Sequence, residues 1–332
     1  MMERRAFVRG AAAVGMTRLL GMPSAEAEPA PETTRVRLGA VPSICLSPQY
    51  VAEDLLRAEG FTDIRFPPAS GGVPGAKEMG AGDADIAMNM AAPLVVALDG
   101  GTPIVVLAGV HVGCFELIAT DRVRTIKDLK GKTVAVFGLE SAQHVFLASM
   151  ATLVGLDPRK DITWVTHPSA EAKRLLAEGK VDGFLGFPPD PQDLRARKIG
   201  HGVVNSATDR PWSQYFCCMV VANREFVARH PVATKRALRA ILKGDQVCAL
   251  DPARAARAYR DRGFVDVPEP LVLQALKEVP FGQWRAYDPA DTLRFYALRL
   301  HEAGMIKASP QKILAQGTDW RFLNELKKEL KG

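Results

Sequence analysis

The groups best suited to covalent chemistry in this 332-residue chain are an adjacent cysteine pair, Cys217 and Cys218, and two histidines, His111 and His144. A thiol beside an imidazole base can act as a nucleophile. Nothing in the sequence brings these groups together, and no GxSxG, HExxH, complete GxGxxG or CxxC motif is present. We therefore predict no catalytic residues and no cofactor, and we classify the protein as a non-enzyme.

The cysteines also bear on metal binding and disulfide formation. There are five of them, unevenly spaced: Cys45, Cys114, Cys217, Cys218 and Cys248. This spacing matches neither a disulfide scaffold nor a zinc site built from paired CxxC motifs, so we predict no metal site. Cys114 and Cys217 lie in strand-like runs and are the pair to test for a disulfide. Buried, unpaired thiols are the interpretation that the sequence favours.

Residues 1–27 have the features of an export signal. Arg4 and Arg5 precede Phe7 and a weakly apolar run over residues 10–22, which leads to Ala25-Glu26-Ala27. This order resembles a twin-arginine signal peptide, and the apolar run is too short to span a bilayer. We expect cleavage after Ala27 and a periplasmic mature protein. An amphipathic helix that stays attached is the alternative.

Composition indicates an ordinary globular protein with a large core. Apolar residues make up 47% of the chain and charged residues 24%, which excludes a disordered or coiled-coil protein. The formal charge of +6 is modest, and the basic residues are not gathered with aromatic residues into a strip. We therefore predict no nucleic-acid binding. The length predicts two domains.

Strand-like and helix-like segments alternate along the first two thirds of the chain. The apolar runs are residues 36–41, 62–66, 86–89, 104–110, 117–120, 133–137, 162–165, 183–186 and 203–204. This alternation predicts an α/β fold with largely parallel sheets. After residues 216–222 the chain becomes helical, and the helices expected at 231–250, 252–262, 268–277 and 289–303 each start at or just after a proline.

A weak internal repeat predicts two similar lobes. Residues 76–86 resemble residues 172–183 when both are aligned on a Gly-x-x-Asp sequence. Upstream, residues 36–60 and 133–155 both resemble a strand, a polar loop and a helix that ends at glycine. The two units keep register, so we favour duplication over chance similarity between two ordinary βα units.

Several segments, in this order and spacing, resemble periplasmic solute-binding proteins of ABC importers. The similar branch handles sulfonates, taurine and nitrate and includes thiamine-pyrimidine-precursor binding proteins. The segments are residues 80–86 with 91–93, 126–135, 179–183, and 220–226 with 230–231. The resemblance covers nearly the whole mature chain. It implies a type II periplasmic binding protein fold, in which two α/β lobes are joined by a two-strand hinge and the C-terminal region is helical.

The same resemblance implies domain boundaries and partners. One lobe would comprise residues 35–121 and 213–305, the other residues 122–212, with crossings near 120–124 and 206–212. Residues 306–332 would form a tail helix. The protein would be a monomer that captures a small molecule and delivers it to an ABC permease and its ATPase.

The expected sheets also predict where a ligand binds. Ligands of open α/β sheets lie at the carboxyl ends of strands, beside loops and helix N-termini. Four loops fit, and a turn near the second crossing adds two more side chains. The candidate contacts are Ser43, Ser47, Asn89, Met90, Ala91, Gly138, Glu140, Ser141, Gln143, Phe187, Asp190, Asp209 and Trp212.

Structural roles compete with ligand binding at several of these positions. Ser47, Asn89 and Ser141 are also typical helix caps. Glu140 is equally well explained as a solvated residue near a helix N-terminus, and Trp212 as packing at the hinge.

The four loops contain Glu140 and Asp190 but no Lys or Arg, which disfavours a bare anion such as nitrate. We expect a ligand with an amino group or protonated nitrogen, such as an amino-sulfonate or an amino-pyrimidine. The alternative class is an exported enzyme or ligand-responsive accessory protein. Pyrimidine-synthesis enzymes of similar fold use a cysteine-rich segment with histidine and iron, which residues 216–219 match only in part.

Overall fold

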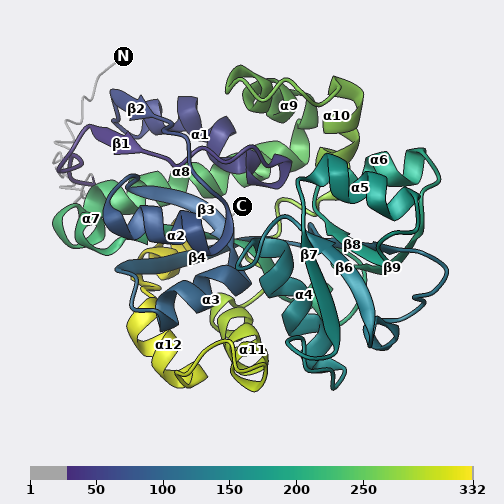
Figure 1. Ribbon diagram of the computed structural model, residues 1–332. Helices are drawn as coiled ribbons and strands as arrows, with labels where there is room; N and C mark the ends of the chain where they lie inside the picture. The colour runs from purple at the N-terminus through teal and green to yellow at the C-terminus, as the bar shows by residue number, and fades with distance from the viewer. Residues whose placement is uncertain (1–27, 331–332) are drawn as a thin grey trace, which may run out of the picture.

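The computed structural model describes residues 28–330, which form two α/β lobes side by side (Figure 1). The predicted signal peptide lies outside the described residues. Each lobe contains one sheet with helices on its faces, and the chain crosses twice between the sheets. The two-lobed fold expected from the sequence is confirmed.

The first lobe is built on strands from both ends of the chain. Their spatial order is β2 (Asp63–Arg65), β1 (Arg35–Arg37), β3 (Ile86–Met90), β10 (Phe216–Asn223) and β4 (Ile104–Val112). A parallel bridge between Leu38 and Ile86 joins the first two strands to the other three. Strand β10 is antiparallel to both β3 and β4, so this sheet is mixed rather than parallel.

The second lobe has a five-stranded sheet. Its order is β7 (Ile162–Thr166), β6 (Lys132–Val136), β8 (Gly183–Gly186), β5 (Glu116–Ala119) and β9 (His201–Asn205). Strand β5 is antiparallel to both of its neighbours. The expectation of largely parallel sheets is confirmed for four of the five strands in each lobe, which run in the same direction. The exception in each lobe is the strand that directly follows a crossing, β10 or β5, which is antiparallel to both of its neighbours.

The first crossing also lies earlier than expected. Because β5 pairs with β8 and β9 along its whole length, residues 116–119 belong to the second sheet, and the crossing is the short segment 113–115. The sequence placed it at 120–124. The second connection, residues 206–215, contains a short 3-10 helix, η3 (Trp212–Gln214).

Helices cover the faces of both sheets. Those of the first lobe are η1 (Ile44–Leu46), α1 (Ser47–Ala58), α2 (Gly72–Ala81), α3 (Ala91–Asp99), α7 (Arg224–Arg229), α8 (Pro231–Leu250), α9 (Pro252–Asp261), α10 (Glu269–Glu278), α11 (Pro289–Glu302), α12 (Pro310–Gly317) and α13 (Arg321–Glu329). Those of the second lobe are η2 (Ile126–Leu129), α4 (Ala142–Leu153), α5 (Ser169–Ala177) and α6 (Asp190–Ala196).

Prolines begin several C-terminal helices, as the sequence predicted. Pro231, Pro252, Pro289 and Pro310 each occupy the first turn, where a missing N–H costs no hydrogen bond. The tail expected over 306–332 divides into α12 and α13, because Thr318 is extended and pairs with strand β4.

One carboxyl group is buried inside the first lobe. Asp245 on α8 is fully buried, and its Oδ2 accepts a hydrogen bond of 2.8 Å from the Gly282 amide. Its Oδ1 has no partner among residues 28–330. Burial raises the pKa of Asp245 to about 8. The side chain therefore folds as a neutral carboxylic acid at acidic and neutral pH.

This pKa predicts a pH dependence of stability. Below about pH 4 the Asp245 carboxyl is protonated in both the folded and the unfolded protein. Between that pH and about pH 8 only the folded protein keeps the proton. The free energy of unfolding therefore falls as the pH rises through this range. In the native protein this group should lower the free energy of unfolding by about 1.4 kcal/mol for each pH unit in this range, and Asp245→Asn should abolish that pH dependence. Urea denaturation from pH 5 to 8 measures it. The control is Asp121→Asn, whose side chain is 88% exposed. Parallel profiles for native protein and Asp245→Asn would contradict the assignment.

Candidate functional site

The two lobes touch at the carboxyl ends of their strands. The Val73 amide of α2 lies 3.5 Å from the Glu140 carbonyl, and the Lys77 ammonium lies 3.6 Å from the Glu140 carboxylate. A Cβ added at Gly72 would lie 2.9 Å from the Ala142 amide nitrogen. The conformation is therefore one in which the lobes are closed on each other at this edge.

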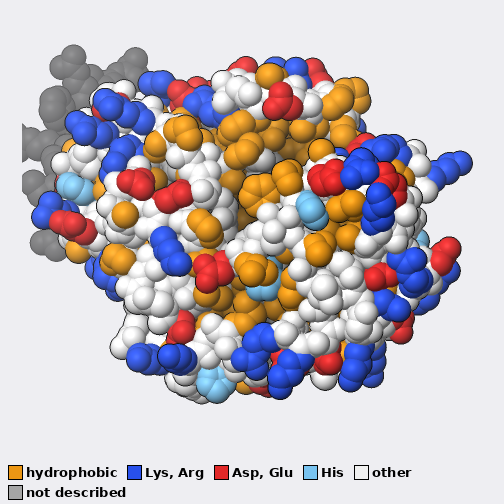
Figure 2. All heavy atoms as spheres, in the orientation of Figure 1, with side chains coloured by type: hydrophobic (Ala, Val, Ile, Leu, Met, Phe, Trp, Pro, Cys, Tyr) orange, Lys and Arg blue, Asp and Glu red, His pale blue; other side chains and the backbone are white. Residues whose placement is uncertain are grey.

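Aromatic side chains fill much of the junction. Phe146 on α4 stacks on Phe115 of the first crossing at 4.6 Å between ring centroids, and lies 5.8 Å from both Trp212 and Tyr296. Tyr296 belongs to α11, so this cluster joins both lobes and both crossings. Figure 2 shows hydrophobic side chains gathered along the same junction.

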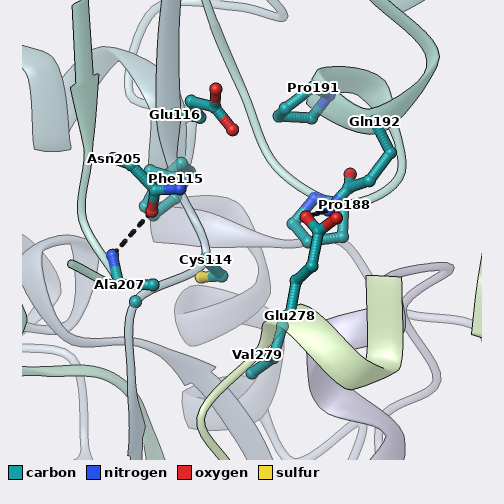
Figure 3. A pocket seen from close by; sticks show the side chains of 11 residues that line it. Cys114, Phe115, Glu116, Pro188, Pro191, Gln192, Asn205, Ala207, Glu278 and Val279 are labelled. Atoms are coloured by element: carbon teal, nitrogen blue, oxygen red, sulfur yellow. Dashed lines mark hydrogen bonds between the residues drawn. The ribbon is translucent and has the colours of Figure 1, made fainter. Parts of the chain in front are cut away.

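A small polar cavity lies between the lobes next to the crossings. Its volume is about 30 Å³, room for about two water molecules. The lining residues are Gly113, Cys114, Phe115, Glu116, Pro188, Pro191, Gln192, Asn205, Ala207, Glu278 and Val279. Figure 3 shows Cys114 and Glu116 on one side, with Pro188, Gln192 and Glu278 facing them. At this volume the cavity is too small for an organic ligand in this conformation.

The cavity carries two carboxylates and one neighbouring cation. Arg195 on α6 forms ion pairs with Glu116 of its own lobe and with Glu278 of the other, the latter at 2.5 Å. Gln192 donates to Glu278 at 2.7 Å, while its own amide oxygen has no partner within residues 28–330. The cavity is acidic overall, and Glu278 connects the lobes.

The two carboxylates differ in their titration. Burial raises the pKa of Glu116 even though Arg195 opposes the shift. Burial also acts on Glu278, but hydrogen bonds from Gln274, Arg195 and Gln192 outweigh it and lower the pKa of that carboxyl. Glu116 is therefore the group that takes up a proton first as pH falls.

Sequence reasoning missed Glu116, Gln192 and Glu278. Glu116 directly follows the first crossing. Because the sequence placed that crossing at residues 120–124, Glu116 was expected inside the first lobe and not at the junction. Glu278 ends α10 and reaches the cavity because α10 packs on α6, a contact between segments distant in the chain. No local pattern marks such a residue.

Three predicted polar contacts make hydrogen bonds inside the fold. Ser141 caps α4 by accepting from the His144 amide at 3.3 Å, as the capping alternative expected. Ser47 donates to the Ile44 carbonyl at 2.7 Å instead of capping a helix. The Asn89 amide binds both the N–H and the carbonyl of Gly72, at 3.1 and 2.9 Å, and so holds the start of α2.

The remaining positions of these loops lie at or near the junction. Met90 and Ala91 are buried where β3 passes into α3, which contacts α4 of the other lobe. Gly138 is half-buried in the loop before α4. Gln143, in the first turn of α4, is only 4% exposed and makes no side-chain hydrogen bond within residues 28–330. Its amide is therefore available to a ligand.

The two acidic loop residues are already paired. Asp190 is buried and lies 3.0 Å from the Lys173 ammonium, which also contacts Asp193 at 2.8 Å. Glu140 is exposed and faces Lys77. The role of Glu140 and Asp190 in ligand binding stays a prediction, since each already faces a lysine. Two further carboxylates at the junction are those of Glu116 and Glu278.

The aromatic candidates and Asp209 have packing and turn-forming roles. Phe187 lies edge-on to Phe115 at 6.3 Å. Trp212 is buried and packs against Phe146 and Phe295, which is the hinge-packing alternative. Asp209 is exposed and accepts from the Asn205 amide at 2.8 Å, closing the turn after β9.

Neither histidine acts as a base for a thiol in this arrangement. His111 is fully buried, with Nε2 2.9 Å from the Cys45 carbonyl and Nδ1 3.1 Å from the Val112 carbonyl. Burial lowers the pKa of His111. His144 accepts from the Glu140 amide at 3.2 Å. Among residues 28–330 no hydrogen bond joins either ring to a cysteine sulfur.

Ser43 and the cysteines lie beside the crossings. Cys114 and Cys217 form a disulfide, the pairing singled out from the sequence, while Cys45, Cys218 and Cys248 are buried free thiols. The Ser43 hydroxyl lies 3.2 Å from the Cys45 sulfur.

Within residues 28–330 no helix has the length and apolar character needed to cross a membrane.

The profile of the NMT1-like family matches residues 29–260, well over half of the chain. The chain belongs to this family. Over 126 residues it is 30% identical to the bicarbonate-binding protein CmpA of Synechococcus elongatus. That stretch covers 37% of this chain and 27% of CmpA, so the chain matches less than a third of this curated relative.

Solved structures of solute-binding proteins share the fold. The alkanesulfonate-binding protein SsuA of Xanthomonas axonopodis pv. citri superimposes with a TM-score of 0.67 at 19% identity, covering 85% of this chain and 96% of SsuA. The periplasmic nitrate-binding protein NrtA of Synechocystis PCC 6803 gives 0.71 at 16% identity, covering 91% and 90%. The resemblance noted in the sequence is confirmed, and at these identities the structures establish the fold alone.

The ion pairs at the cavity predict unequal effects of mutation. Arg195→Met would leave the buried Glu116 carboxylate without its cation, so we expect the free energy of unfolding to fall by about 1–3 kcal/mol after allowance for the partial exposure of Arg195. Glu116→Gln should cost less, because it leaves no buried charge. Urea denaturation measures both. Arg197→Met, which removes an exposed partner of Asp193, is the control; an equal loss in Arg195→Met and Arg197→Met would refute this account.

Proposed function

We propose that this NMT1-like protein is the extracytoplasmic solute-binding component of an ABC importer. The observation that carries the proposal is the pair of α/β lobes joined by two crossings, with strand-end loops from both lobes meeting at one junction. A ligand that contacts both lobes stabilises the closed form over the open form. The membrane permease, coupled to its ATPase, would recognise the closed surface.

We further propose that the ligand is a small polar organic nutrient, similar to an amino-sulfonate or a pyrimidine. Glu116 and Glu278 supply two carboxylates to the cavity against the single guanidinium of Arg195, which favours a ligand that brings an amino group or protonated nitrogen. Gln143, at the first turn of α4, does not line this cavity; in this proposal its amide offers the ligand a neutral donor and acceptor from the second lobe. Binding does not change the ligand chemically in this proposal.

We also propose a location and an oligomeric state for the protein. The protein would be exported by the twin-arginine route, cleaved after Ala27, and work in the periplasm as a monomer. The resemblance of residues 1–27 to a signal peptide supports export. The periplasmic origin of the structurally similar NrtA agrees with this location.

A thermal-shift screen tests the ligand class. The protein is heated with taurine, alkanesulfonates, nitrate, aromatic acids or amino-pyrimidines, and mass spectrometry identifies what is recovered. We expect an amine-bearing compound to raise the melting temperature saturably, by a stabilisation of about 2.7 kcal/mol at one hundred times Kd, and to be recovered unchanged. A shift with nitrate alone would refute the ligand class, and a chemically altered compound would favour the exported-enzyme alternative.

The free amide of Gln143 gives a test of where the ligand binds. Gln143→Leu should weaken binding of the compound found in the screen about tenfold, equivalent to ~1.4 kcal/mol, through loss of one hydrogen bond. Isothermal titration calorimetry measures the change. Gln214→Leu, on the exposed face of η3, is the matched control and should bind normally. Unchanged affinity in Gln143→Leu would place the ligand away from α4.

A further inference from the structure

Four of the five cysteines meet in the interior beside the crossings. Cys45 comes from η1, Cys114 from the first crossing, and Cys217 and Cys218 from the start of β10. The Cys218 sulfur lies 3.9 Å from that of Cys45 and 4.0 Å from that of Cys217. The sulfurs of Cys45, Cys114 and Cys218 all lie within 4.8 Å of one another.

These separations are close to those of a tetrahedral metal site. With four zinc–sulfur bonds of about 2.3 Å, the sulfur atoms lie ~3.8 Å apart. In the folded protein, however, Cys114 and Cys217 are joined by a disulfide, so Cys45 and Cys218 are the free thiols of the cluster. The number of available ligands therefore depends on the redox state of one bond.

We propose that reduction of the Cys114–Cys217 disulfide turns this cluster into a binding site for one thiophilic cation, Zn²⁺ or Cu⁺, held by the sulfurs of Cys45, Cys114, Cys217 and Cys218. A dithiol reductant supplies the two electrons and two protons that convert the disulfide to two thiols and is itself oxidised to a disulfide. Each thiol that binds the cation then releases its proton. This site adjoins the cavity proposed for the ligand, because Cys114 also lines that cavity.

The surroundings of the sulfurs suit such a site. Sulfur ligands without oxygen or nitrogen select soft or borderline cations such as Cu⁺ and Zn²⁺. The Ser43 hydroxyl lies 3.2 Å from the Cys45 sulfur and can donate a hydrogen bond to a ligated thiolate. His111 binds the Cys45 carbonyl at 2.9 Å and so fixes the backbone that presents this sulfur.

Burial points the same way. All four cysteines are buried, and only Cys114 borders the cavity, which limits the access of water to the cation. Because Cys114 lies on the first crossing, a bound cation would tie that crossing to η1 and β10.

Metal titration of the full-length protein tests the proposal. The protein is reduced anaerobically with a dithiol, freed of reductant, and titrated with Co²⁺, whose sulfur charge-transfer bands report thiolate ligation. Zn²⁺ competition and a chromophoric Cu⁺ chelator then rank the two cations. We expect one cation per chain in the reduced protein and none in the oxidised protein. Binding that is equal in both redox states, or absent in the reduced protein, would overturn the proposal.

Variants and thiol mapping make the test residue-specific. Cys45→Ser and Cys218→Ser should each weaken metal binding by more than about tenfold, whereas Cys248→Ser, a buried cysteine outside the cluster, should bind normally. Circular dichroism checks that each variant folds. If one does not, alkylation followed by mass spectrometry on the native sequence decides: metal should slow modification of the four cluster cysteines and leave the rate at Cys248 unchanged. Equal slowing at Cys248, or none in the cluster, would refute the site.

Discussion

The pairing of β10 with both β3 and β4 underlies the two-lobed architecture. The Phe216 ring of β10 packs on Gly109 of β4, where an added Cβ would lie 2.1 Å from the ring. This contact helps to seat β10 in the middle of the first sheet, between β3 and β4. The chain must therefore return from the second lobe, and two connections rather than one join the lobes. A hinged pair of lobes with a junction between them is the direct consequence.

The junction combines apolar packing with a few charges. The Phe115, Phe146 and Tyr296 rings supply nondirectional contact that tolerates small shifts between lobes. The bonds of Glu278 to Arg195 and Gln192 are directional and hold one relative position. A ligand that donates hydrogen bonds to Glu116 and Glu278 would replace the contacts that Arg195 and Gln192 make with these carboxylates. In the proposed function, closure and ligand binding would therefore depend on the same groups.

The crossings also organise the cysteines. Because β10 begins where the second crossing ends, it places Cys217 and Cys218 next to Cys114 of the first crossing, and the turn into α1 adds Cys45. The disulfide ties the first crossing to the strand that follows the second. The proposed ligand and the proposed cation would therefore act on neighbouring parts of one hinge.

The sequence by itself determined the element types, the helical C-terminal third and the two-lobed class, because periodicity and helix-starting prolines are local signals and the family segments occur in a fixed order. It indicated Cys114 and Cys217 as the pair to test for a disulfide but favoured unpaired thiols, and the structure decided for the disulfide. Only the tertiary structure decided that residues 116–119 belong to the second sheet, that Lys173 neutralises Asp190, and that Glu116, Gln192 and Glu278 line one cavity. These features arise from pairing between segments far apart in the chain, and such pairing leaves no mark in the local sequence.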